Sequence, residues 1–139
     1  MLLPKKVKHR KWHSFRRNPN RPVMIDTRGT NMAFGSFGLK AMSAARVTSN
    51  QIEAARKVVS RYAGKTGKVW IRIFPDMPYT AKPAEVPMGS GKGDPQGYCF
   101  QVKAGRIIFE IDGVPEAEAK EAFRKAGAKL PVKSKVVAR

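Results

Sequence analysis

Residues 98–111 read Tyr98-Cys99-Phe100-Gln101-Val102-Lys103-Ala104-Gly105-Arg106-Ile107-Ile108-Phe109-Glu110-Ile111. Residues 98–103 and 106–111 are rich in β-branched and aromatic side chains, and Ala104-Gly105 separates them at the spacing of a two-residue hairpin loop. We therefore expect two strands that pair antiparallel. Cys99 is the only cysteine of the chain, so no internal disulfide can form, and we interpret it as a small buried hydrophobe in a reducing compartment.

A helix is expected upstream of this hairpin, at about residues 49–63. Thr48 precedes Gln51 by three residues, which is the spacing of a capping box, and Gly64 suits a left-handed C-terminal cap. The predicted buried stripe consists of Ile52, Ala55, Val59 and Tyr62. The remaining surface carries the basic residues Arg56, Lys57 and Arg61.

A second helix is expected after the hairpin, with Pro115 at its first position and acidic residues in its first turn. Glu116 with Lys120, and Glu121 with Lys125, have the four-residue spacing of favourable helical ion pairs. The predicted apolar stripe of this helix consists of Ala119, Phe123, Ala126 and Leu130. The acids Glu110, Asp112, Glu116, Glu118 and Glu121 cluster along the sequence, so one end of the molecule should be nearly neutral.

Strands are also expected at residues 34–42 and 68–74, and the tail at 132–139 could add an edge strand. Residues 75–97, between the expected strands at 68–74 and 98–103, are rich in proline and glycine and are interpreted as a long exposed loop. This order predicts an α+β fold, a two-layer sandwich of a mainly antiparallel sheet with two helices. A parallel α/β fold is the alternative. We expect a basic arm at 1–32 and a single globular domain at 33–139.

The charge of the chain favours a nucleic-acid partner. There are 28 lysines and arginines against 10 acids, a formal net charge of +18, which is far more than solubility requires in a small domain. An arm this basic should become ordered only on a polyanion. The helix residues Arg56, Lys57 and Arg61 are also expected to bind RNA. The arm residues expected to bind RNA are Lys5, Lys6, Lys8, His9, Arg10, Lys11, Trp12, His13, Arg16 and Arg17.

Patterns typical of enzymes are missing from the sequence. His9 and His13 lack further metal ligands nearby, and both histidines lie in the arm, so no serine has an evident base. The glycines around Lys92 do not have Walker spacing and do not open a helix. We therefore expect no catalytic residue, cofactor or metal. No apolar run is long enough to span a membrane, and the N-terminus lacks a signal-peptide core.

Lysine and arginine interleaved with aromatic residues and glycines favour folded RNA as the partner, because the helix-turn-helix and zinc-finger patterns of duplex DNA readers are not present. Two other functions stay open at this point. The chain could be a free-standing RNA chaperone, or an enzyme that acts on RNA. Sedimentation with or without a large particle separates the first of these from a structural role in a ribonucleoprotein.

Seven strings of the sequence carry a specific resemblance. They are Phe34-Gly35-Ser36-Phe37-Gly38-Leu39, Gln51-Ile52-Glu53-Ala54-Ala55-Arg56, Lys68-Val69-Trp70-Ile71-Arg72-Ile73-Phe74-Pro75-Asp76, Lys82-Pro83-Ala84-Glu85, Met88-Gly89-Ser90-Gly91-Lys92-Gly93, Phe109-Glu110-Ile111 and Lys129-Leu130-Pro131-Val132-Lys133. In this order, and over nearly the whole chain, they resemble the family of large-subunit ribosomal protein sixteen of bacteria and organelles.

The resemblance implies an α+β domain packed on large-subunit ribosomal RNA, beside neighbouring ribosomal proteins, with the arm buried in RNA and a role in late subunit assembly. It implies a cytoplasmic or organellar ribosome as the location, without a membrane or a homo-oligomer. It also implies that the loop points toward transfer RNA in the aminoacyl site, near the peptidyl-transferase region. The loop residues carried over are Lys82, Met88, Gly89, Ser90, Gly91, Lys92 and Gly93.

Two features depart from the family pattern. Many bacterial members carry arginine where this chain has Pro87, so a contact or modification that depends on that arginine does not carry over. The segment between Arg17 and Thr30 is also longer and richer in proline than is usual in the family, and its course over RNA does not carry over.

Overall fold

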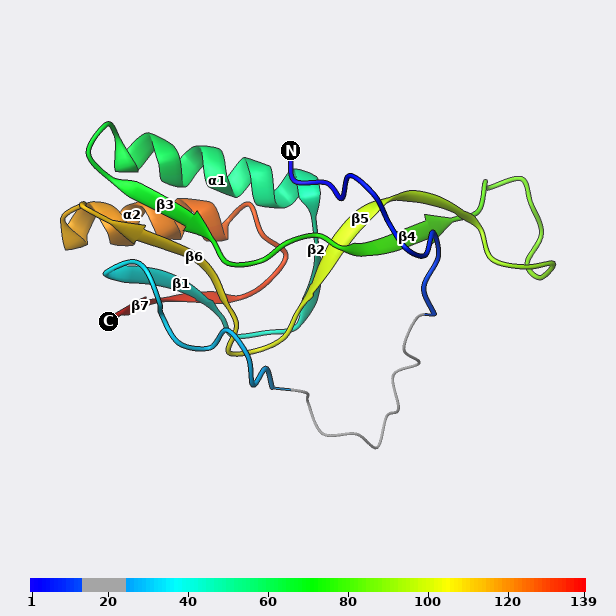
Figure 1. The fold of residues 1–139 in the computed structure, drawn as a ribbon, viewed down its shortest axis with the longest axis horizontal. Coiled ribbons are helices and arrows are strands. Elements are labelled where there is room, and N and C mark those ends of the chain that lie inside the picture. The colour runs from blue at the N-terminus through cyan, green and yellow to red at the C-terminus, as the bar shows by residue number, and fades with distance from the viewer. Residues whose placement is uncertain (14–24) are drawn as a thin grey trace.

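Figure 1 shows the computed structural model, which describes residues 1–13 and 25–139. The described residues form two helices and seven strands, an α+β architecture that confirms the predicted fold class. In chain order the elements are β1 (Phe37–Ala41), β2 (Ala45–Thr48), α1 (Ser49–Ala63), β3 (Lys68–Ile71), β4 (Met77–Ala81), β5 (Asp94–Val102), β6 (Ile107–Asp112), α2 (Glu116–Gly127) and β7 (Ser134–Ala138).

The strands form two sheets. The larger sheet has the order β3-β6-β1-β7 and the smaller one has the order β2-β5-β4. Every pairing between these named strands is antiparallel, so the alternative of a parallel α/β fold is wrong. The tail forms β7 at an edge of the larger sheet, as expected.

The predicted pairing of residues 98–103 with 106–111 is wrong, because these runs belong to different sheets: β5 pairs with β2 and β4, whereas β6 pairs with β1 and β3. The turn between them exists, with Gly105 at φ 97°. Arg106 N–H donates to Lys103 O (3.3 Å) across the turn, but the neighbouring bonds go to β1: Gly105 N–H donates to Ala41 O (2.7 Å), and Ala41 N–H donates to Arg106 O (2.8 Å). The chain therefore crosses from one sheet to the other at this turn.

Both helices follow their local sequence signals. Thr48 and Gln51 form the predicted capping box, with Thr48 N–H donating to Gln51 Oε1 at 2.9 Å. Along α1, Ala63 is buried while the expected stripe residue Tyr62 is only half-buried. Pro115 stands directly before α2 rather than at its first position. The expected ion pairs form, with Nζ–Oε1 distances of 2.6 Å for Lys120–Glu116 and 3.4 Å for Lys125–Glu121.

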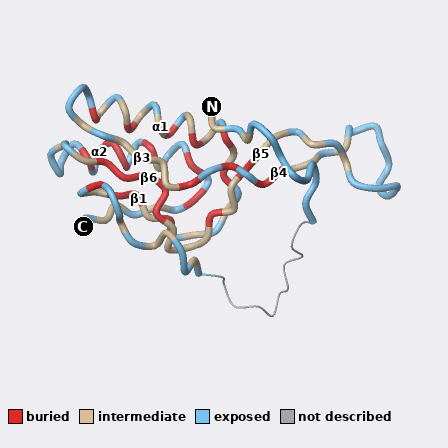
Figure 2. Tube along the Cα trace, viewed as in Figure 1, coloured by how far each residue is buried: buried red, intermediate tan, exposed pale blue. Residues whose placement is uncertain are grey.

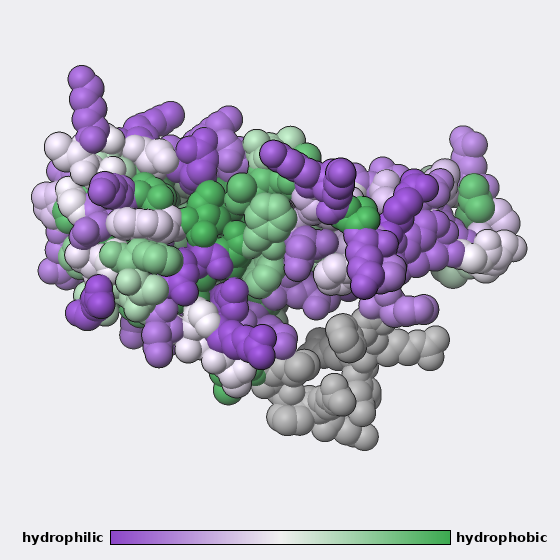
Figure 3. All heavy atoms as spheres, viewed as in Figure 1, coloured by the Kyte–Doolittle hydropathy of each residue, from purple (hydrophilic) through white to green (hydrophobic). Residues whose placement is uncertain are grey.

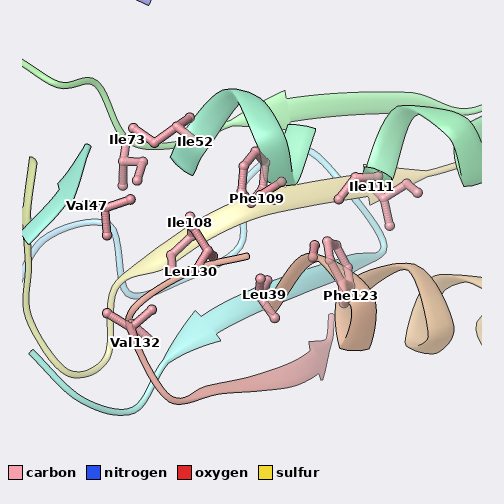
Figure 4. Close-up of a cluster of buried hydrophobic side chains, with 14 of the residues drawn as sticks. Leu39, Val47, Ile52, Ile73, Ile108, Phe109, Ile111, Phe123, Leu130 and Val132 are labelled. Carbon is pink, nitrogen blue, oxygen red and sulfur yellow. The ribbon is translucent and has the colours of Figure 1, made fainter. Parts of the chain in front are cut away.

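The main core lies between the two helices and the larger sheet (Figure 4). Phe109 and Leu39 from the sheet meet Ile52 of α1 and Phe123 of α2, and all four are at most 1% exposed. Cys99 is buried and free, as expected, and burial raises the pKa of its thiol. The core thus fixes the helices and the sheet, while other parts of the chain extend beyond it.

The prediction of a single loop over residues 75–97 is wrong. Met77–Ala81 forms strand β4, and Asp94–Val102 forms strand β5. The two strands form a long hairpin that projects away from the core, and only residues 82–93 connect them as a loop (Figures 1 and 2). Nearly all residues of this loop are exposed. The hairpin therefore holds the predicted transfer-RNA-facing residues at the far end of the molecule.

Candidate nucleic-acid interface

The first 13 residues run from the N-terminus of α1 along the β4–β5 hairpin (Figure 1). Leu2 packs against the core, so the start of the arm is held in place. A hollow separates the arm from the hairpin, lined by Val7 and Arg10 on one side and by Tyr79 and Tyr98 on the other. The arm is therefore laid along the hairpin in the direction of its loop.

All predicted RNA-binding residues between Lys5 and His13 are exposed on this arm. Hydrophilic side chains dominate the surface of the arm and hairpin in Figure 3. Trp12 lies among the cations with 41% of its surface accessible, so its indole can stack on an unpaired base while the lysines contact phosphates. Arg16 and Arg17 were also predicted to bind RNA, and they lie outside the described residues.

The loop at 82–93 has a tightly folded tip. Gly89 and Gly91 have φ angles of 99° and 94°, which glycine adopts without strain. Ser90 between them also has a positive φ, of 52°. Lys82 donates from Nζ to the carbonyl oxygen of Gly89 and closes the loop across its width. Met88 is fully exposed at the tip. The predicted loop residues are thus gathered on one small, backbone-rich surface.

The arm and the loop meet, although they are 80 residues apart in sequence. Lys92 donates from Nζ to the carbonyl oxygen of Trp12. In return, Lys11 Nζ donates to Lys92 O at 3.1 Å and lies 3.8 Å from a carboxylate oxygen of Asp94. We call this set of contacts, made by Lys11, Trp12, Lys92 and Asp94, the arm–loop contact. It joins two segments that the sequence suggested for two different RNA partners.

The three predicted cations of α1 are not equivalent. Arg56 forms a two-bond ion pair with Glu53, at 2.9 Å from Nε and 2.7 Å from Nη2, and the Arg56 guanidinium lowers the pKa of the Glu53 carboxyl to about 2. Lys57 and Arg61 are exposed and have no ion pair within the described part of the chain. Lys57 and Arg61 are therefore the α1 cations that are free to meet phosphates.

Residues 4–137 match the family model described as Ribosomal protein L16p/L10e. The chain belongs to this family. It is 53% identical to the large ribosomal subunit protein uL16 of Zymomonas mobilis over 139 residues, covering 100% of this chain and 94% of that protein. It is 53% identical to uL16 of Rhodopseudomonas palustris and 52% identical to uL16 of Rhodospirillum rubrum, again over the whole chain, covering 98% and 97% of those proteins.

Membership in the L16p/L10e family confirms the predicted resemblance and makes the chain a structural, RNA-binding constituent of the large ribosomal subunit, not an enzyme. It works in translation, in the cytoplasmic particle that also holds ribosomal RNA and other ribosomal proteins. No helix of the described residues is long and apolar enough to cross a membrane. Within residues 1–13 and 25–139, no three His, Cys, Asp or Glu side chains gather as a metal site.

One important residue of this L16p/L10e domain was misjudged from sequence. Glu110 was counted among the clustered acids that should make one end of the molecule nearly neutral, and its burial was not foreseen: its side chain is completely buried. Its carboxylate accepts the N–H groups of Ala33, Phe34 and Gly35, at 2.6 Å for Phe34 and 2.7 Å for Gly35, and it pairs with Arg72. Burial raises the pKa of Glu110, but these hydrogen bonds outweigh it and hold the pKa below its usual value. Glu110 therefore fixes the segment in front of β1.

The surroundings of Glu110 explain the glycine at position 35. A Cβ atom there would lie 2.6 Å from the carbonyl oxygen of Ile111, so only glycine lets the backbone approach the sheet this closely. Beside it, the rings of Phe34 and Trp70 stack with centroids 5.9 Å apart, and the Arg72 guanidinium lies 5.3 Å from the centre of the Phe34 ring. The glycines near residue 35 indicated a close backbone approach in the sequence. The burial of Glu110 had no such sequence signal.

The end of the predicted arm also contacts the domain. Asp26 N–H donates to Ala104 O at 2.9 Å, and Ile107 N–H donates to Gly29 O at 2.8 Å. Arg106 lies 3.7 Å from the Asp26 carboxylate. The chain from residue 25 onward is therefore attached at the turn where the two sheets meet.

Proposed function

We propose that the arm, with Arg56, Lys57 and Arg61, binds large-subunit ribosomal RNA, and that the loop at 82–93 reaches transfer RNA in the aminoacyl site. This places the loop near the peptidyl-transferase region and gives the protein a role in late subunit assembly. The observation that carries the proposal is the arm–loop contact, in which Lys92 holds the backbone of Trp12. Through it, RNA bound by the arm can set the position of the loop.

The proposed mechanism relies on charge and shape without chemistry of its own. Ordering a basic arm costs conformational entropy, which contacts with phosphates offset. Once the arm is ordered along the β4–β5 hairpin, Lys11 and Trp12 restrain Lys92 and with it the loop tip. The exposed glycine backbone at the tip can approach a phosphate or ribose closely. Assembly of the subunit and positioning of transfer RNA would then depend on the same ordered arm.

Affinity for large-subunit ribosomal RNA should fall steeply with salt. Residues 1–13 of the arm alone present five lysines and arginines, and α1 adds further cations. About six or more phosphate contacts are therefore expected to lower affinity about 10³-fold between 50 and 200 mM salt. Filter binding of the full chain to a ribosomal RNA transcript over that range measures the slope. A flat salt dependence would contradict an electrostatic RNA contact by the arm.

Replacing Lys92 with alanine together with Gly91 with valine should leave the fold intact but slow transfer-RNA accommodation several-fold. Both residues are exposed in the loop, outside the packed core, and truncating an exposed lysine usually changes stability by less than about 0.5 kcal/mol. Valine at position 91 would force a side chain onto a backbone with φ 94° and reshape the tip. Thermal unfolding of the free protein and accommodation rates of reconstituted large subunits are the two measurements.

Lys120→Ala is the matched control, because it also removes an exposed lysine but lies on α2, outside the arm and the loop. It should leave accommodation unchanged. If the double variant fails to enter the large subunit, the loop takes part in assembly rather than in transfer-RNA positioning. If it enters and accommodation keeps its normal rate, the loop does not act on transfer RNA.

A further inference from the structure

A second basic hollow lies between the helices, away from the arm. Val58, Arg61 and Tyr62 of α1 line one side, and Arg124, Lys125, Ala128 and Lys129 at and beyond the end of α2 line the other. We call it the interhelical groove. Its volume is about 510 Å³, with Val58, Ala128 and the Tyr62 ring as apolar walls. Arg61, Lys125 and Lys129 are exposed around it.

The groove carries uncompensated positive charge. Four cations line it and no acid does. The neighbouring acid, Glu121, is shared by two of them, through hydrogen bonds of 2.8 Å to Arg124 and an Nζ–Oε1 distance of 3.4 Å to Lys125. Arg61 and Lys129 make no ion pair with the described residues. An anion in the groove would therefore meet two cations that the fold leaves unpaired.

Lys125 is held in place toward the groove rather than left free in solvent. Its Nζ donates to the Tyr62 hydroxyl and lies 5.1 Å from the centre of the Tyr62 ring. A cation fixed by an aromatic ring and a carboxylate loses little further side-chain entropy when it binds an anion. The groove thus combines a fixed cation with two cations that have no ion pair among the described residues.

Helix stability alone does not account for this cluster. Arg61, Arg124 and Lys125 lie in the last turns of their helices, where cations interact favourably with the helix dipole. Lys129 lies beyond the last turn of α2, where the dipole interaction is weaker, yet it adds a fourth cation to the groove. Four cations with no acid in the lining are more than the ends of two helices require, which favours a ligand over a purely structural role.

We propose that the interhelical groove binds backbone phosphates of an RNA strand, as a second RNA contact separate from the arm. The inference rests on the proposed function only in taking ribosomal RNA as the partner. The arm lies beside Thr48 and Ser49 at the N-terminus of α1, whereas Arg61 is 12 residues further along, about 18 Å at the rise of an α-helix. That distance exceeds the span of neighbouring phosphates, so the two contacts hold different parts of the RNA.

The test replaces Arg61 and Lys129 with glutamine in the full chain. The control replaces Lys133 and Lys135, two exposed lysines near β7, and changes the net charge equally. With a full-length large-subunit ribosomal RNA transcript, the groove variant should bind at least about tenfold more weakly than the control. The slope of log affinity against log salt should fall by about 1.4, the value for two lost phosphate contacts on single-stranded RNA.

Three outcomes overturn the proposal. Equal losses in the groove and control variants would assign the effect to net charge. Unchanged binding by the groove variant, while the unsubstituted chain keeps its salt-dependent affinity, would remove the groove and the RNA-binding role proposed for Arg61, and would leave the proposed role of the arm standing. If the unsubstituted chain does not bind the transcript, the proposed function fails, and the groove proposal fails with it.

Cross-linking of native large subunits provides a second readout of the same site. Ultraviolet light should attach a nucleotide to the peptide that contains residues 125–129, as expected for RNA seated in the groove. Chemical cross-links from Lys129 to a neighbouring ribosomal protein, without any nucleotide on that peptide, would show instead that a protein covers the groove and would overturn the proposal.

Discussion

Replacing Glu110 with glutamine should lower the free energy of unfolding by about 3 kcal/mol, the lower end of the cost of breaking a buried ion pair. The Glu110 carboxylate is fully buried and accepts three backbone N–H groups as well as the Arg72 guanidinium. An amide has one acceptor oxygen, and its NH₂ group would face donors. The variant therefore leaves buried donors, and the Arg72 charge, without partners.

The Glu110→Gln variant should also loosen the segment of chain in front of β1. Ala33, Phe34 and Gly35 are held against the sheet by this carboxylate, and the Phe34–Trp70 stack sits on the same segment. Urea unfolding measures the stability change, and amide exchange at residues 33–35 measures the release of the segment. Glu116→Gln is the control, since Glu116 forms only an exposed ion pair, and its stability should hardly change.

The contribution of Glu110 should also depend on pH. Its pKa is lower in the folded protein than its ordinary value of 4.5, so the unfolded chain takes up the proton first as pH falls. The stabilisation is therefore complete well above pH 4.5, and it is lost as the pH drops through that value toward the folded pKa. Below pH 4.5 the gap in stability between the original chain and Glu110→Gln should narrow. A gap that widens in acid would contradict this assignment.

The helices could be predicted from sequence because their signals are local. The Thr48–Gln51 capping box and the stripe through Phe123 involve residues three or four positions apart. Strand pairing depends on partners distant in sequence, and this is where the prediction failed. The spacing at Ala104-Gly105 encodes a turn, but whether the flanking runs pair with each other depends on β1 and β2, which pair with them instead.

Strand β4 was missed for a different reason. Met77-Pro78-Tyr79 contains a proline, which cannot donate to a neighbouring strand and is therefore taken as a loop signal. In the structure β4 is an edge of the smaller sheet, so only one of its sides needs backbone donors. Proline is tolerated at such an edge, and Pro78 lies opposite Tyr98 in the ladder. Edge position cannot be read from one segment of sequence.

The candidate interface was predictable in its composition but not in its arrangement. Charge identified the arm, and glycine with lysine identified the loop, because both signals lie within short segments. The arm–loop contact joins Trp12 to Lys92 through a backbone carbonyl, and no side-chain pattern predicts a bond to a carbonyl. The burial of Glu110 could not be predicted from sequence either, because the residues that bind its carboxylate, 33–35, are more than 70 positions away along the chain.

Replacing Gly93 with valine should release the loop from its fixed position. A Cβ atom at residue 93 would lie 2.4 Å from the carbonyl oxygen of Ala81 and 2.6 Å from its carbonyl carbon. These are backbone atoms of β4, so the clash cannot be relieved by a side chain, and the terminal pair Ala81 with Asp94 should open. Amide exchange at residues 81–94 should accelerate at least about tenfold, which corresponds to about 1.4 kcal/mol.

The consequence for function follows from the arm–loop contact. Lys92 is next to Gly93, so a displaced strand end carries Lys92 away from Trp12, and accommodation of transfer RNA should slow more than in a Gly89→Ala control. Position 89 lies in the same loop and has open space around its added Cβ. Its φ of 99°, unlike the backbone of Gly93, adds conformational strain, so the control tests strain without the clash against β4. If amide exchange accelerates but transfer RNA is accommodated at the normal rate, an ordered loop is not required for positioning transfer RNA. If amide exchange does not change, β4 has shifted to make room for the valine side chain and the loop has stayed in place. Slow accommodation together with fast exchange is the result expected if the arm and the loop act as one unit.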